Sequence, residues 1–324
     1  MLKNIFGGRD WRTSAAHLLL LSKFIEPKQL EDYANREEWK SPLEEEPAKA
    51  ISRFIKEGLL VEGGLEDRLN YRYKVTDLRG LLKERNLKVS GNKDELISRL
   101  IEYDRKGVEK LVSGLKLVKC SMQGRTLAED YLATVKEQRQ LAEEQTLLAL
   151  KDRNFRKASQ IVSSYEAQQV FPRGIGIDWK NYDTRRDVMM LEMIFSSMPK
   201  ILKGLDRSKY EKLRLVASMM HLWGTNKGGE WIEQDFVTGI RYDTDTAARM
   251  ILFHAHFLYN LQEYKEMGVK RAYFISYVND DFICPECKKL DGKGFKISEL
   301  PELPYEKCTS EMGCRCTTSA CKPD

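Results

Sequence analysis

The chain has 324 residues, of which 42% are apolar, 10% aromatic and 32% charged. This composition requires a buried core and excludes a disordered tail, a collagen-like fibre and a membrane protein. The net charge of +5 comes from 54 basic and 49 acidic side chains, so the charges are nearly balanced and any nucleic-acid surface has to be local.

The first apolar run, from Ala15 to Leu21, is too short to cross a bilayer. The N-terminal residues also lack the basic lead and the small-residue cleavage site of a signal peptide. We therefore expect no membrane association and an intracellular, cytoplasmic location. In such a reducing compartment, clustered cysteines bind metal more often than they form disulfides.

Residues 1–72 are predicted to form helices followed by a hairpin. A serine–proline pair and three glutamates, at 41–46, are typical of a helix start, and apolar spacing carries that helix to Gly58. Strands are predicted over 59–61 and 71–75, joined by a Gly-Gly turn. This pattern resembles the end of a winged helix. Alternatively the hairpin serves only for packing, since the segment has 12 basic and 13 acidic residues.

Residues 73–107 carry nine basic and six acidic side chains, the highest density of positive charge in the chain. Leucines and isoleucines at helical spacing predict two short amphipathic helices, with Leu87 and Val89 filling the space between them. Ser90 and Gly91 are expected to form the turn, and the second helix to begin near residue 92. The free N–H groups at that helix start would lie beside lysine side chains, which is a phosphate-binding geometry.

These residues resemble a SAP domain, a helix, extended loop and helix module of chromatin, repair and other DNA-associated proteins. The resemblance implies that five residues face the DNA backbone: Lys88, Ser90, Gly91, Asn92 and Lys93. It implies outer contacts by Arg79, Lys83 and Arg99. One alternative is an ordinary helical hairpin with a solvated charged face. Another is a SAP fold that binds protein, or that only packs against the rest of this chain. This alternative arises because six acidic side chains reduce the positive charge of the segment.

Residues 108–270 are predicted to be a compact helical body rather than a flexible linker. A capping box of Thr126 and Glu129 is expected to start a charged helix. Two histidines, His254 and His256, are two positions apart on a helix and face different directions, so they are expected to be structural. Any protein partners are expected to bind this region. Further helices are predicted over 153–170, 184–198, 207–222 and 244–267.

Six of the seven cysteines fall within the last 41 residues. The Cys-Pro-x-Cys motif places two thiolates on a tight knuckle, and later cysteines can complete the tetrahedral coordination of zinc. Cys314 and Cys316 are two apart in an expected strand, so only one of them should reach the ion. Four thiolates leave no open position, so the zinc would be structural; a disulfide framework is the alternative. The favoured ligands are Cys284, Cys287, Cys308 and Cys314, with Cys316 as the substitute.

Residues 265–318 resemble the C-terminal module of tailed-phage head-morphogenesis (minor head) proteins. The shared features are a long helix, a strand, Cys-x-x-Cys, a Leu-Asp-Gly turn and a closing Cys-Arg-Cys. That family has a histidine three residues before the last Cys-x-Cys, where this chain has Glu311. The resemblance therefore implies that Cys308 replaces that ligand. Because residues 271–324 hold eight basic and nine acidic side chains, we do not expect a DNA-reading zinc finger.

The sequence thus predicts a mainly α protein in four parts. These are a helix-hairpin unit over 1–72, the SAP-like helix-loop-helix over 73–107, a helical domain over 108–270, and a zinc-stapled α+β module over 271–324. The favoured function is that of a non-enzymatic DNA-binding protein that contacts phosphates without reading the base sequence.

Two other functions are compatible with these sequence features. The first is a structural protein of phage or prophage head morphogenesis, which would place the chain in a virion rather than on the nucleoid. The second is an accessory subunit or a member of a DNA-processing enzyme. The sequence contains no His-Asn-His set, phosphate-cradling glycine loop or spaced Asp…Glu-x-Lys signature, so we do not expect an enzyme.

Overall fold

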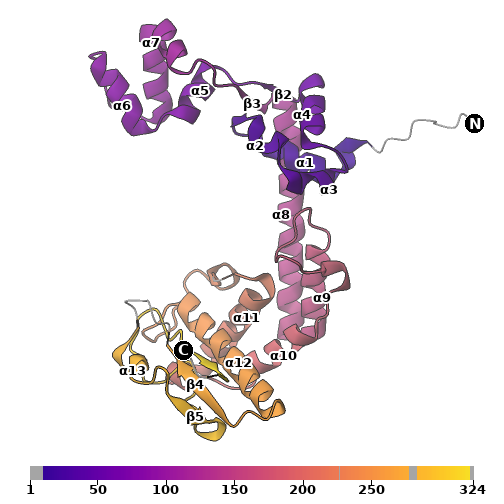
Figure 1. Cartoon of the computed structure of the whole chain (residues 1–324), viewed down its shortest axis with the longest axis vertical. Helices are drawn as coiled ribbons and strands as arrows, with labels where there is room; N and C mark the ends of the chain where they lie inside the picture. Colours follow the sequence, from indigo (N-terminus) through magenta and orange to yellow (C-terminus); the bar gives the residue numbers. More distant parts are fainter. Residues whose placement is uncertain (1–9, 226, 277–282, 322–324) are drawn as a thin grey trace, which may run out of the picture. The chain divides into compact units, whose positions relative to one another are not determined.

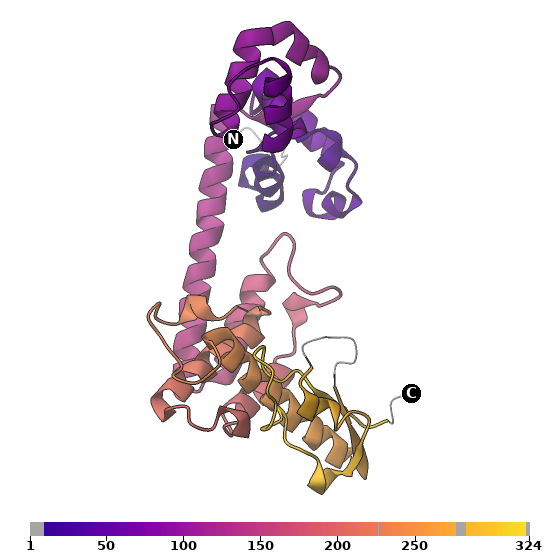
Figure 2. The same ribbon diagram turned by 90° about the vertical axis from the view of Figure 1, so that its left-hand side faces the viewer.

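The computed structural model describes residues 10–225, 227–276 and 283–321. It is mainly helical with small sheets, which confirms the predicted fold class (Figure 1). The chain divides into two compact units, Met1–Gln138 and Arg139–Asp324. The boundary falls inside helix α8 (Met122–Lys151), which is continuous in Figure 2. The finer division into four domains stays a prediction. Within the described residues, no helix is long and apolar enough to cross a membrane.

The first unit contains a three-stranded antiparallel sheet in which β3 (Leu117–Cys120) lies between β1 (Lys28–Gln29) and β2 (Leu60–Glu62). Since β3 follows the SAP-like segment in sequence, that segment is inserted between two paired strands. The N-terminal helices of this unit are α1 (Ala15–Ser22), α2 (Glu31–Ala34), α3 (Lys40–Leu43) and α4 (Pro47–Lys56), with 3-10 turns η1 (Trp11–Thr13) and η2 (Glu37–Trp39).

The helix predicted to begin at Ser41 begins instead at Pro47. Glu44 adopts a left-handed backbone conformation, with a φ of 56°, which ends α3 and separates it from α4. Proline then occupies the first position of α4, where no intrahelical N–H bond is lost. The predicted end of this helix at Gly58 is confirmed, because Gly58 follows the C-cap and has a φ of 72°.

The prediction of a hairpin over residues 59–75 is wrong. Strand β2 pairs with β3 rather than with residues 71–75. Gly64 is the N-cap of a helix, and its amide donates to Asp67 Oδ2 at 2.8 Å, so the Gly-Gly pair starts a helix instead of forming a turn. A winged-helix hairpin is therefore not formed. The helices between β2 and β3 are α5 (Leu65–Arg72), α6 (Val75–Glu84) and α7 (Lys93–Leu111).

Helix α8 begins at Met122 and not after the predicted cap at Thr126. The Ser121 hydroxyl accepts a hydrogen bond from the amide of Gly124 at 3.2 Å, while the Thr126 hydroxyl lies within the helix and donates to the carbonyl of Met122. The early start follows from the sheet, because the amide of Ser121 donates to the carbonyl of Leu59 beside β2.

The second unit contains the remaining helices. The four helices predicted between residues 153 and 267 are confirmed, with ends that differ by a few residues. Their buried side chains form one core together with the C-terminal part of α8. The elements are α9 (Phe155–Glu166), α10 (Arg185–Ile194), α11 (Arg207–Trp223) and α12 (Thr244–Glu266), with 3-10 turns η3 (Trp179–Asn181), η4 (Lys200–Leu202) and η5 (Gly229–Trp231).

The cysteine-rich residues pack against α12. His254 on this helix is buried, with Nδ1 2.8 Å from the carbonyl oxygen of Leu303 and Nε2 2.9 Å from the hydroxyl of Ser197. His256 faces His221 instead, so the two histidines lie on different faces as predicted, and their structural role stays a prediction. Residues 277–282 of the predicted module lie outside the described residues. The sheet places β4 (Arg271–Ile275) between β5 (Gly294–Lys296) and β6 (Thr317–Ser319), with α13 (Pro285–Lys288) and η6 (Ile297–Glu299) nearby in sequence.

Two helical glycines give a matched test of this packing. A Cβ on Gly124 would lie 2.1 Å from the carbonyl oxygen of Leu59, whereas a Cβ on Gly80 in α6 would meet nothing within 4 Å. We expect Gly124→Ala to lower the free energy of unfolding by about 1–3 kcal/mol, because helix and strand must separate. Gly80→Ala should raise it by about 1 kcal/mol through helix propensity. Urea denaturation measures both; equal midpoints for the two variants would contradict the described packing.

Candidate nucleic-acid interface and metal centre

A small leucine-rich core holds helices α5, α6 and α7 together (Figure 1). The apolar positions predicted for the two SAP-like helices are confirmed as buried or partly buried. Helix α5, which the sequence did not predict, also contributes to this core. Its fully buried side chains are Leu69 of α5, Leu78 and Leu82 of α6, Leu96, Ile97, Leu100 and Val108 of α7, and Val112.

The loop between α6 and α7 starts at a left-handed residue. Asn86 has a φ of 58°, a conformation that asparagine tolerates better than most residues, and it lets the chain leave α6. The amide of Leu87 donates back to the carbonyl of Leu82 at 2.9 Å. Leu87 packs against the core as predicted, but Val89 is 40% exposed, so the prediction that both fill the space between the helices is wrong for Val89.

The predicted start of the second helix near residue 92 is confirmed. Asn92 Oδ1 accepts from the amide of Glu95, and Glu95 Oε2 accepts from the amide of Asn92, each at 3.0 Å. Gly91 precedes this reciprocal cap with a φ of 129°. This backbone conformation favours glycine, and a Cβ there, 2.3 Å from Glu95 Oε2, would push the Glu95 carboxylate out of the cap.

Two of the predicted contact residues hold the loop in place. Arg99 Nη1 donates to the carbonyl oxygens of Lys88 at 2.5 Å and Ser90 at 3.1 Å. Lys93 Nζ donates to the carbonyl oxygen of Asn70 at 2.6 Å, at the end of α5. Arg99 and Lys93 are accordingly half-buried, and they tie the loop to α7 and α5.

The other six predicted residues are exposed. Lys88, Ser90, Gly91 and Asn92 follow one another along the loop, and Arg79 and Lys83 lie one turn apart on α6. Sequence reasoning missed the surface contributed by α5, because residues 71–75 had the alternation of a strand. The helical signal that could have revealed α5 is the pair Leu65 and Leu69, four residues apart.

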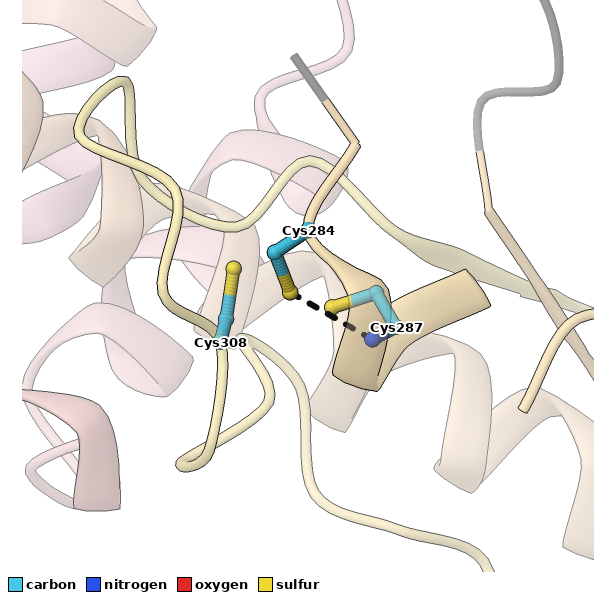
Figure 3. A group of neighbouring side chains, drawn as sticks. All are labelled: Cys284, Cys287 and Cys308. Carbon is cyan, nitrogen blue, oxygen red and sulfur yellow. Dashed lines mark hydrogen bonds between the residues drawn. The ribbon is translucent and has the colours of Figure 1, made fainter. Parts of the chain in front are cut away.

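The C-terminal cysteines converge as the sequence predicted. The Sγ atoms of Cys284, Cys287 and Cys308 all lie within 4.8 Å of one another, and their sulfurs point toward a common centre (Figure 3). A second group, also within 4.8 Å, is formed by Cys287, Cys314 and Cys316. Four other thiols therefore surround that of Cys287. Cys321 is exposed and belongs to neither group.

Backbone amides point at two of these sulfurs. The amide of Cys287 donates to Cys284 Sγ at 3.3 Å, the dashed line in Figure 3, and the amide of Tyr305 donates to Cys314 Sγ at 3.3 Å. Burial by itself would raise the pKa of Cys284, but amide N–H groups of Thr309 and Cys287 outweigh it and lower the pKa to about 7. These are the surroundings of a thiolate that binds a cation.

Crowding has the opposite effect at the centre of the cluster. Hydrogen bonds with the thiols of Cys308, Cys314 and Cys316, together with burial, raise the pKa of Cys287. Several neighbouring thiolates cannot stay ionised without a counter-charge, and a divalent cation supplies one. A small, half-open cavity of about 10 Å³ is lined by Cys284, Cys287, Cys308 and Cys316.

The prediction that Cys314 and Cys316 point to opposite faces is wrong. Both sulfurs lie within 4.8 Å of Cys287 Sγ. The reason is that residues 314–316 are not part of a strand, since β6 begins only at Thr317. Cys314 is nevertheless fully buried, while Cys316 is half-buried.

Comparison with known families identifies a SAP domain over residues 72–105 of this chain. This match confirms the resemblance of the basic segment, and its limits agree with α6, the loop and most of α7. No curated protein and no solved structure matches the chain. The resemblance of the cysteine-rich module to phage head-morphogenesis proteins gains no support from these comparisons.

Proposed function

We propose that this protein binds duplex DNA by its phosphate backbone, through the loop of the SAP domain and the start of α7. The observation that carries the proposal is the exposed run from Lys88 to Asn92, held rigidly ahead of a helix N-terminus within a detected SAP domain. A helix start presents backbone N–H groups and the positive end of its dipole, both of which favour a phosphate.

The proposed contacts divide into two groups. Lys88, Ser90, Gly91, Asn92 and Lys93 would meet the backbone directly. Arg79, Lys83 and Arg99 would be outer contacts, with Arg99 also bracing the loop carbonyls. Ammonium, guanidinium, hydroxyl and amide groups are the usual partners of phosphates, and such contacts carry no base-sequence information. The binding is therefore proposed to be independent of sequence.

The acids of the first turn of α7 limit the affinity. Asp94 and Glu95 are both exposed beside the proposed phosphate site, although Glu95 is engaged in the helix cap. Their negative charge offsets part of the attraction of Lys88 and Lys93 for DNA. The SAP domain is accordingly proposed to bind DNA weakly. Its dissociation constant should be micromolar or higher, as is typical of binding dominated by phosphate contacts.

The cysteine cluster is proposed to hold one structural zinc ion. The favoured ligands are Cys284, Cys287, Cys308 and Cys314, because all four are fully buried, with Cys316 as the substitute. The small cavity of about 10 Å³ beside Cys284, Cys287 and Cys308 is the space proposed for this single ion. When bound, zinc would join α13 to the two later cysteine segments. Such thiolate ligation suits a reducing, intracellular compartment.

The helices of the second unit are proposed to bind protein partners.

DNA binding can be tested with charge reversals at the loop. We expect the full-length Lys88→Glu, Lys93→Glu double variant to lose most of its affinity for duplex DNA. The slope of log affinity against log salt should fall by about 2, because two phosphate contacts are lost. Fluorescence anisotropy across a salt series measures both quantities. The variant should still fold, because an acid at the first position of α7 is favoured by the helix dipole, which offsets the lost hydrogen bond from Lys93 to Asn70. Circular dichroism checks that the helices are kept.

The matched control is Lys106→Glu, Lys110→Glu, which makes the same change in charge on exposed residues beyond the SAP-domain match. This control should keep its affinity for DNA within about threefold, since distant exposed charges are screened by salt. Equal losses in the two double variants would point to net charge rather than to the loop and would remove the proposed contact site.

Zinc can be tested by elemental analysis of the purified full chain. We expect about one zinc ion per chain, and its removal by a chelator to increase amide hydrogen exchange in 283–321 while sparing 72–105. Structural zinc sites contribute on the order of 10 kcal/mol to folding, so loss of the ion should loosen the cysteine-rich residues.

Single serine variants identify the ligands. Cys287→Ser should lose the metal, whereas Cys321→Ser, which changes an exposed thiol outside the cluster, should retain it. Cys314→Ser is expected to lower zinc content more than Cys316→Ser. A metal-free protein whose clustered cysteines are paired as disulfides in mass spectrometry would contradict the zinc site.

A further inference from the structure

An open pocket lies beside the SAP domain, at the junction between α5 and α6. Its volume is about 480 Å³, and it is lined by Gln29, Tyr71, Arg72, Tyr73, Asp77 and Leu115. The walls come from β1, the last turn of α5, the start of α6 and the chain after α7. The three consecutive residues at the end of α5 supply its aromatic and cationic surface.

The tyrosines differ in how firmly they are held. Tyr73 packs against the leucine core of α5, α6 and α7, and the guanidinium of Arg72 lies over its ring, 5.9 Å from the centroid. Tyr71 is 43% exposed, so a large aromatic surface is open to solvent. An exposed ring next to a cation is the arrangement on which nucleic-acid bases stack.

The polar groups of the pocket can pair with the edge of a base. Gln29 carries an amide that donates and accepts, and Asp77 carries a carboxylate of which Oδ2 already accepts from the amide of Lys74 at 2.9 Å. The charges of Arg72 and Asp77 balance within the lining. The exposed Lys74 and Lys116 flank it in sequence. The pocket lining is aromatic and has no net charge, and lysines flank it in sequence. Such a pocket suits an uncharged base, while the phosphates of the nucleotide stay outside.

A hydrogen bond links the proposed phosphate-binding loop to α5, the helix that ends at the pocket. Lys93, at the start of α7, donates its ammonium to the carbonyl oxygen of Asn70, and Asn70 directly precedes Tyr71. Helix α5 also contributes Leu65 and Leu69 to the core that carries the loop. The end of α5 is therefore tied to the start of α7, next to the proposed phosphate site.

We propose that this pocket binds an unpaired base of single-stranded DNA, so that the protein favours junctions between duplex and single strand. The inference rests on the proposed DNA binding by the loop and adds a second subsite to it. A base inside a duplex is stacked between its neighbours and cannot present its faces to Tyr71, whereas an unpaired base can. Stacking on an aromatic ring tolerates every base, so the preference is for structure and not for sequence.

The test compares two DNA probes on the full-length protein at one salt concentration. One probe is a blunt duplex, and the other is the same duplex with a single-stranded thymine extension. The wild-type protein should bind the extended probe about tenfold more tightly, the effect of one stacked base. Tyr71→Ala should abolish that preference and leave affinity for the blunt duplex unchanged. Tyr71→Phe, which keeps the ring, should retain it.

The outcomes separate this inference from the proposed function. Binding to the blunt duplex that depends on Lys88 and Lys93, with no preference for the extension, would overturn the pocket alone. A preference that survives in Tyr71→Ala would also overturn it. If the blunt duplex is not bound but the extension is, in a Tyr71-dependent way, the pocket stands and the duplex assignment fails. Tighter binding of a uracil RNA extension than of the DNA extension would replace DNA by RNA as the ligand.

Discussion

The burial of a few leucines between α6 and α7 is the interaction on which the proposed DNA site depends. Leu78, Leu82, Leu96 and Leu100 are completely excluded from solvent, and they fix the two helices at the ends of a short loop. With its leucines committed to this core, the segment leaves Lys88 to Asn92 exposed, Val89 included. The reciprocal cap of Asn92 and Glu95 then sets where α7 starts and which way its amides point.

A different constraint applies to the cysteine cluster of the second unit, because ionised thiols buried together would repel one another. Cys284, Cys287, Cys308 and Cys314 are buried together at the end of the chain, beside the helical core formed by α9 to α12. Amides directed at sulfur favour ionised thiols, while crowding around Cys287 opposes them. One divalent cation resolves that conflict, which is why a metal is proposed although the thiols also fit together without one.

Local sequence patterns predict the structure correctly where contacts between residues close in sequence decide it. Leucine spacing predicted both SAP helices, and glycines at 58 and 91 marked real conformational requirements. The failures involved long-range pairing. Nothing near Leu60 indicates that its partner strand lies after α7, at residues 117–120, and so the alternation at 71–75 was mistaken for that partner. Helix α5, and with it the pocket beside Tyr71, went unpredicted for the same reason. The motif spacing indicated a cysteine knuckle, but the convergence of five sulfurs depends on the irregular path of residues 308–316.

The central claim is that the loop and the first turn of α7 touch DNA. Amide chemical shifts of the isotope-labelled full chain, recorded during titration with a short duplex, test it residue by residue. The account predicts that the largest changes occur from Lys88 to Asp94, that they are the same for duplexes of unrelated sequence, and that they reverse on addition of salt. Saturating DNA that leaves these amides unmoved while shifting residues of the second unit would contradict it.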